Sequence, residues 1–203
     1  MFKKLASETF GLSDIGKIIS PADYDKVDAD DYLFHEDGEK IFFLIKSKKD
    51  EYCFTNFALI HIDGDSAVSR KRTVKRYEYA SHKISQILIE TAGNIDLDVE
   101  LKFTLDERLA FSIDVNKNCL ESLKDIYKVL ISIGKLQHHQ EIARDNAAQC
   151  FGVMASMYKI SAIESEDAIV KHYNGMLLNY NSTILERYTK RDFSNIFEKY
   201  IRA

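Results

Sequence analysis

The chain has 203 residues, of which 45% are hydrophobic and 30% are charged. This balance is typical of a soluble globular protein with one medium domain, or with one domain and an appendage. The net charge of −4 disfavours binding to duplex nucleic acid, because that function normally needs an excess of basic residues. Eight glycines and one proline exclude collagen-like and low-complexity chains.

The N-terminal residues MFKKLASETFGLSDIG lack the apolar stretch of about seven or more residues that a signal peptide requires. The longest apolar run, IFFLI at 41–45, is too short to span a bilayer. The three cysteines, Cys53, Cys119 and Cys150, are an odd number and form no CxxC pair. We therefore expect a cytoplasmic protein with reduced cysteines.

Two segments precede the first predicted strand. Residues 2–19 have apolar side chains at helical spacing, but Gly11 and Gly16 interrupt them, so we expect short helical turns that end before Pro21. Residues 23–39 are rich in Asp and Glu, and we expect a solvated loop there. A calcium loop is disfavoured because its ladder of ligands and its glycine are missing.

Residues 39–116 read as short strands separated by turns. The segment IDLDVELKF at 95–103 alternates apolar and charged side chains, and LAFSIDV at 109–115 repeats the alternation. One buried face and one wet face are typical of antiparallel sheets. About seven strands are predicted, at 39–47, 52–55, 57–62, 68–80, 83–90, 95–103 and 109–115.

The remaining chain reads as helix. Residues 118–136 carry an apolar stripe, with Asn116 or Asn118 as the N-cap and Gly134 as a plausible end. Two segments with coiled-coil-like seams follow, linked by SAIESED at 161–167 with Ser165 as a possible cap, and a short amphipathic segment at 193–201 closes the chain. The predicted seam residues are Ala143, Ala147, Cys150, Met154, Met157, Ile169, Tyr173, Met176, Tyr180 and Ile184.

Residues 11–64, GLSDIGKIISPADYDKVDADDYLFHEDGEKIFFLIKSKKDEYCFTNFALIHIDG, resemble bacterial pleckstrin-homology (PH)-like domain proteins of the YvbH type. The similarity continues through SRKRTVKRY (69–77), ETAGNIDLDVELKF (90–103) and the helix at 118–136. The resemblance implies two nearly orthogonal antiparallel sheets capped by a C-terminal helix, which agrees with the strands counted independently. It also implies cyclic rings, and longer members carry a helical extension regarded as an oligomerisation region. We thus expect an α+β protein with a PH-like barrel at 1–137 and a helical hairpin at 138–203.

Two charged strand segments are candidates for an interaction surface. The first is basic and aromatic, comprising Arg70, Lys71, Arg72, Lys75, Arg76, Tyr77 and Tyr79. It is either a surface for an anion or acidic partner or a solvated edge strand, and the acidic total charge favours the second interpretation. The second is the acidic face of Asp96, Asp98 and Glu100, read as a wet sheet face or as an interface with a neighbouring subunit.

Lys46, Lys48 and Lys49 lie at the first strand–strand turn, where eukaryotic PH domains hold phosphoinositide headgroups. The following strand, EYCFT, lacks the further basic residues of that motif. The lysines are therefore either lipid-facing or simply solvated.

No nucleophile elbow, glycine-rich phosphate loop or HExxH motif is present, and the adjacent His138 and His139 point to different helix faces. The resemblance likewise supplies no catalytic residues, so we expect no enzyme activity, no metal and no cofactor. The expected function is an oligomeric scaffold that presents PH-like domains in a ring and binds an unidentified protein partner. The alternative is a peripheral module for anionic membrane lipids.

Overall fold

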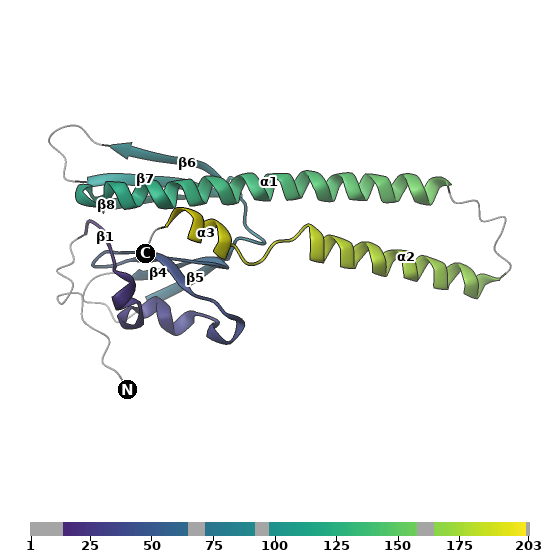
Figure 1. The fold of residues 1–203 in the computed structure, drawn as a ribbon, viewed down its shortest axis with the longest axis horizontal. Coiled ribbons are helices and arrows are strands. Elements are labelled where there is room, and N and C mark those ends of the chain that lie inside the picture. Colours follow the sequence, from purple (N-terminus) through teal and green to yellow (C-terminus); the bar gives the residue numbers. More distant parts are fainter. Residues whose placement is uncertain (1–13, 65–71, 92–97, 158–164, 202–203) are drawn as a thin grey trace. The chain divides into compact units, whose positions relative to one another are not determined.

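The computed structural model describes residues 14–64, 72–91, 98–157 and 165–201, without the side chains of Met154, Ala155 and Met157 (Figure 1). The chain divides into two compact units. The sheet unit comprises Met1–Gly134 with Arg191–Ala203, and the helical unit comprises Lys135–Lys190. The sequence placed all residues after 137 in the hairpin, whereas the structure returns 191–201 to the sheet unit.

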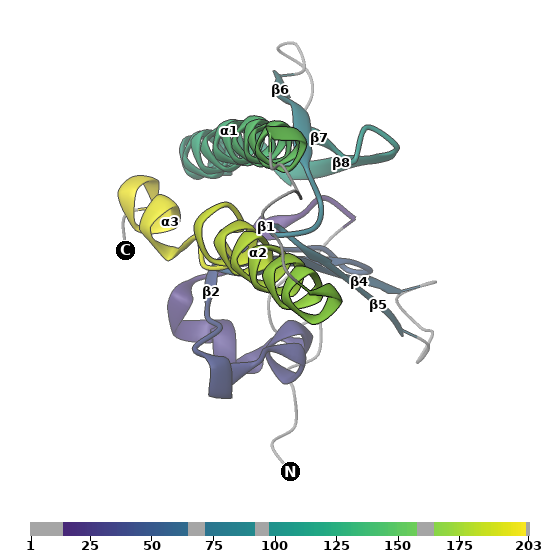
Figure 2. The same cartoon turned by 90° about the vertical axis from the view of Figure 1, so that its right-hand side faces the viewer.

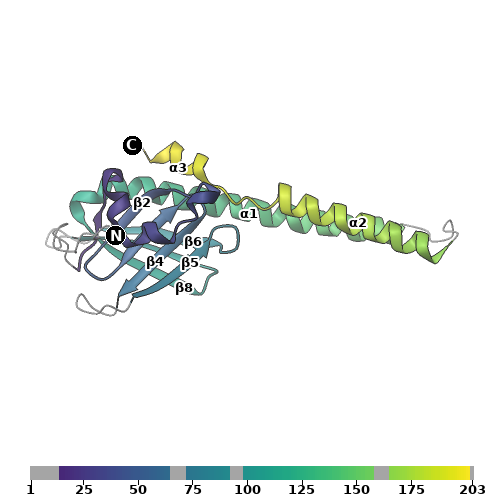
Figure 3. The ribbon, with the colours of Figure 1, turned by 90° about the horizontal axis from the view of Figure 1, so that it is seen from below.

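The sheet unit contains two antiparallel sheets (Figure 2). The five-stranded sheet has the order β1-β2-β3-β4-β5, and the three-stranded sheet has the order β6-β7-β8. The strands are β1 (Lys17–Ile18), β2 (Ile41–Lys46), β3 (Glu51–Thr55), β4 (Ala58–Gly64), β5 (Arg72–Glu78), β6 (Ile84–Thr91), β7 (Asp98–Leu105) and β8 (Leu109–Asn116). In Figure 3, β4 and β5 of one sheet lie over β8 of the other. The predicted α+β class, with two antiparallel sheets and a following helix, is confirmed.

The alternation of apolar and polar side chains in β7 and β8 matches the alternation of buried and more exposed side chains in the structure. Val99, Leu101 and Phe103 of β7 are buried, and Phe111 and Ile113 of β8 lie beside them. Phe103 stacks on Phe111 with ring centroids 4.8 Å apart and makes an edge contact with Phe54 of β3. These aromatic contacts join the two sheets in one core.

Two expectations for the N-terminal part are wrong. Residues Lys17–Ile18 form β1 and pair with β2 instead of forming a helical turn. Next to them, the backbone amide of Gly16 donates to the backbone carbonyl oxygen of Asp114. The acidic segment is not a solvated loop but three 3₁₀ helices, at Pro21–Lys26, Asp28–Tyr32 and His35–Asp37. Val27, Ala29 and Leu33 on these turns are buried in the core, which the acidic composition concealed.

The first long helix does not end at Gly134. After a 3₁₀ turn at Lys117–Cys119, which Asn116 caps as predicted, α1 continues from Leu120 to Met157. A Cβ atom at Gly134 would lie 2.7 Å from the carbonyl oxygen of Ile84 at the start of β6. Glycine is therefore required by the close approach of the helix to the sheet, not by a helix terminus.

The helical unit combines the C-terminal part of α1 with α2 (Glu166–Arg187). Ser165 caps α2 as predicted, because its side chain accepts a hydrogen bond from the amide of Ala168. Within this unit the ring of Phe151 lies 4.8 Å from that of Tyr180, and Arg144 donates to the carbonyl oxygen of Tyr188. None of the described helices combines the length and apolar character needed to cross a membrane.

Replacing Gly134 tests the close approach of α1 to β6. We expect Gly134→Ala to lower the free energy of unfolding by about 1–3 kcal/mol, because the new methyl group must displace backbone atoms. Gly152→Ala is the matched control on the same helix, since nothing lies within 4 Å of its Cβ position. There alanine should stabilise the helix by up to about 1 kcal/mol. Denaturant unfolding of both variants measures this, and equal stability of Gly134→Ala and the wild type would contradict the steric account.

Candidate functional site

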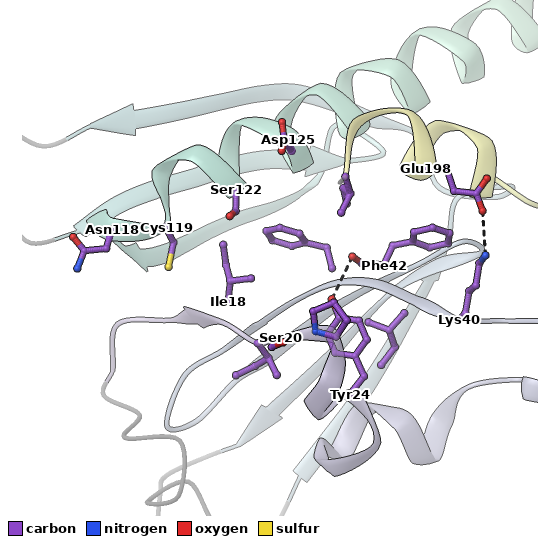
Figure 4. Close-up of a pocket in the computed structure, with 15 residues that line it drawn as sticks. Ile18, Ser20, Tyr24, Lys40, Phe42, Asn118, Cys119, Ser122, Asp125 and Glu198 are labelled. Atoms are coloured by element: carbon purple, nitrogen blue, oxygen red, sulfur yellow. Dashed lines mark hydrogen bonds and ion pairs between the residues drawn. The ribbon is translucent and has the colours of Figure 1, made fainter. Parts of the chain in front are cut away.

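The sheet unit holds a pocket of about 850 Å³ between the start of α1, strand β2 and the C-terminal helix α3 (Ser194–Tyr200) (Figure 4). Its volume is in the range of ligand-binding clefts. Apolar side chains dominate the lining and include Ile18, Tyr24, Phe42 and Ile201. The sequence pattern did not reveal this pocket, because its walls come from segments that are far apart along the chain.

Several polar groups of the pocket lining have partners within the sheet unit. The Tyr24 hydroxyl donates to the carbonyl oxygen of Phe42 over 3.3 Å, and burial raises the pKa of this hydroxyl above its ordinary value. At one end Lys40 Nζ lies 3.1 Å from Glu198, as Figure 4 shows. Asp125 is paired with Lys128 over 2.8 Å. The pocket therefore offers an apolar surface with a paired, charged rim.

Helix α3 is anchored to the sheet unit by aromatic packing. Phe193 and Phe197 are 0% exposed, and Phe197 stacks on Phe42 with centroids 4.9 Å apart. The backbone amide of Phe193 also donates to the carbonyl oxygen of Asn56. The segment predicted to belong to the hairpin thus completes the core and forms one wall of the pocket.

The lining suits binding better than catalysis. Ser122 and Cys119 are the hydroxyl and thiol on the α1 side, and the described lining includes no histidine to activate either one. In the described part of the chain, no group of three or more His, Cys, Asp or Glu side chains could hold a metal ion.

The basic and aromatic segment does not form one open surface. Arg70 and Lys71 lie outside the described residues. Tyr79 is 2% exposed and lies against Phe193, so it cannot contact a partner as predicted. Burial raises the pKa of its hydroxyl well above the ordinary value.

Two basic residues of β5, Lys75 and Arg76, have partners within the sheet unit. Arg76 binds the buried Glu39 over 3.0 Å and also Glu78, and Lys75 pairs with Asp63. Tyr77 is half-buried in edge contacts with Phe111 and His82, while Arg72 is exposed. These pairs neutralise Lys75 and Arg76, so on the described part of β5 an anionic partner would have to rely on Arg72.

The predicted acidic face is also only partly available, because Glu100 has partners on its own sheet. Asp96 lies outside the described residues, and Asp98 is half-buried. Hydrogen bonds from Lys102 and Ser112 lower the pKa of Glu100. Across the sheet, burial and the negative charges of Glu100 and Asp98 raise the pKa of Asp114. Glu100 is therefore held ionised by its own sheet.

Lys46 is placed differently from the other two turn lysines. It is buried and forms an ion pair with Glu51 across the β2–β3 hairpin. The Glu51 carboxylate also accepts from the backbone amide of Ala29 over 2.9 Å, so the pair ties the 3₁₀ turns to the sheet. Lys46 is thus a structural residue, and a lipid surface would have to rest on the exposed Lys48 and Lys49.

The predicted seams of the helical unit only partly face each other. Ala143, Ala147, Met176, Tyr180 and Ile184 are half-buried, but Cys150 and Tyr173 are exposed, and Ile169 is at the margin. The side chains of Met154 and Met157 lie outside the described part. The sequence analysis missed the inner contacts of Phe151 and Arg144, which lie one position after the predicted seam residues Cys150 and Ala143.

Large exposed apolar side chains gather in the helical unit. They are Ile142, Val153, Ile169, Val170, Tyr173, Leu177, Leu178 and Leu185. Leu178 is 70% and Leu185 57% exposed, and α2 contains no buried residue. Exposed apolar surfaces of this kind are typical of protein–protein contact regions.

Comparison with known proteins agrees with the fold. The bacterial PH domain family model matches residues 9–133. YvbH of Bacillus subtilis is 48% identical over 203 residues and matches 99% of both chains, and YjqA of the same organism is 36% identical over 48% of this chain and 76% of its own. The crystal structure of a PH-domain-containing bacterial protein from Exiguobacterium sibiricum has a TM-score of 0.85 at 41% identity, covering 93% of this chain and 100% of that one. The chain belongs to the bacterial PH domain family.

Proposed function

We propose that this protein is a non-catalytic scaffold in which the helical units of several copies associate, in a closed ring, and present the PH-like sheet units to a protein partner. The observation that carries this proposal is the exposed apolar surface of α2. A lone helical hairpin leaves Val170, Leu178 and Leu185 in water, and burial against another copy would remove this unfavourable exposure. Closed symmetry is the common way in which identical chains bury such a face.

The distribution of charge along the chain supports association between the helical units of identical copies. Residues 135–190 contain six basic and six acidic residues, so this segment has no net charge, although the whole chain carries −4. Two copies would therefore meet through their neutral segment, and the excess negative charge would stay in the sheet units. Long-range repulsion between the helical units is minimal in this arrangement.

The sheet unit supplies the part that meets the partner. Its pocket is apolar, about 850 Å³ in volume and already walled by α3, which shows that an amphipathic polypeptide segment packs on this surface. Repeating the pocket on several copies would raise the apparent affinity for a multivalent partner without any new contact.

Aspartate substitutions on α2 test the assembly. We expect Leu178→Asp with Leu185→Asp to reduce the mass in light scattering, because both charges would be buried at the interface. Ala168→Asp with Asn179→Asp places the same two charges on exposed positions of α2 that lie roughly 80° or more around the helix from Leu178 and Leu185, and should leave the mass unchanged. A wild-type chain that is monomeric at all accessible concentrations would contradict the proposal.

Vesicle flotation separates the protein-partner proposal from the membrane alternative. Because Lys46 is paired with Glu51, we expect the wild-type chain not to float with vesicles of phosphatidylserine and phosphatidylcholine at low salt. Salt-sensitive flotation that Lys48→Gln with Lys49→Gln abolishes would overturn this expectation and favour the membrane function.

A further inference from the structure

The exposed face of α2 contains a pair of polar residues at its centre. Asn174 and Asn181 are both exposed and lie seven residues apart, so they recur at nearly the same angle around the helix. At 100° per residue, Val170 and Leu177 flank them on one side, and Leu178 and Leu185 flank them on the other. The face is thus an aliphatic surface with two amides along its middle.

The opposite side of α2 is already used within the chain. Tyr180 contacts Phe151 of α1, and Met176 and Ile184 are half-buried near the same side. The exposed face is therefore a second contact surface, distinct from the one that holds the hairpin together. Its core positions follow a heptad pattern, with Val170, Asn174, Leu177 and Asn181 at alternating spacings of four and three.

Burial of this face would remove both amides from water. An amide that loses its hydrogen bonds with water on burial, and gains none in return, destabilises a complex. An unrelated apolar helix would leave both amides unpaired. A second copy of α2 satisfies them automatically if it lies parallel and in register, because an asparagine amide is both donor and acceptor and can pair with its own counterpart.

We propose that Asn174 and Asn181 pair with the same residues of a second copy, so that α2 helices associate in parallel and in register. This inference rests on the proposed self-association and specifies its geometry. Buried asparagines in coiled coils fix register and the number of strands at some loss of stability. A rotation axis along the helices, one of the closed symmetries open to identical chains, would bring identical residues together at equal heights.

Cysteine crosslinking tests the register on the full chain. In a Cys119→Ser, Cys150→Ser background, Asn174→Cys and Asn181→Cys should each form a disulfide with its own counterpart under mild oxidation. An antiparallel pair can be symmetric about one of these positions but not about both, so crosslinking in both variants requires a parallel arrangement. Asn179→Cys, on the opposite face of α2, is the control and should remain uncrosslinked.

Leucine substitution tests the role of the amides. We expect Asn174→Leu with Asn181→Leu to raise the melting temperature and to replace one discrete mass by a mixture of species, because the device that selects the register is lost. Asn179→Leu adds a similar apolar side chain elsewhere and should change neither. If the wild-type chain is oligomeric but neither cysteine crosslinks and the leucine variant keeps its single mass, this inference is overturned while the scaffold function stands. A monomeric wild type would overturn both.

Discussion

A hairpin of two helices can bury only the face that each helix turns toward the other. In the helical unit the contact of Phe151 with Tyr180 accounts for one face of α2. Val170, Leu178 and Leu185 lie outside that contact and remain in water. The apolar content of α2 therefore exceeds what the hairpin can bury, and the proposed assembly follows from this excess.

The sheet unit has the opposite character, because distant segments of the same chain cover its described core. Phe193 and Phe197 return from the C-terminal end of the chain and close the core over Tyr79 and Phe42. Two of the basic residues that attract attention in the sequence are also paired within the sheet unit. Lys46 pairs with Glu51, and Arg76 pairs with Glu39 inside the fold. Breaking such a buried pair would leave an uncompensated charge, so these residues hold the unit together.

The sequence predicted the features that depend on local order. The alternation in 95–103 and 109–115 located β7 and β8, and the capping residues Asn116 and Ser165 were identified correctly. The errors concern residues whose role depends on distant partners. A glycine at this position is typical of a helix end. The role of Gly134 is instead set by the carbonyl oxygen of Ile84, which lies far away in the sequence.

The sequence does carry a signal for one of the contacts that were not predicted, the ion pair between Lys46 and Glu51. Lys46 and Glu51 flank the turn at 47–50, and opposite charges at such positions indicate a cross-strand pair. No such signal marked the pocket, because its walls at Ile18, Phe42 and Ile201 come together only in the folded chain. The docking of α3 was equally hidden, since the spacing of Phe193 and Phe197 shows an apolar face but not what covers it.

Hydrogen exchange on α2 tests the central claim most directly. The amides of Glu166–Arg187 would be compared in the wild-type chain and in the Leu178→Asp, Leu185→Asp variant at the same concentration, with β7 and β8 as internal references. Buried between copies, α2 should exchange slowly in the wild type and much faster in the variant, while the two strands exchange alike in both. Equally fast exchange of α2 in the two proteins would show that its apolar face stays in water and would contradict the account.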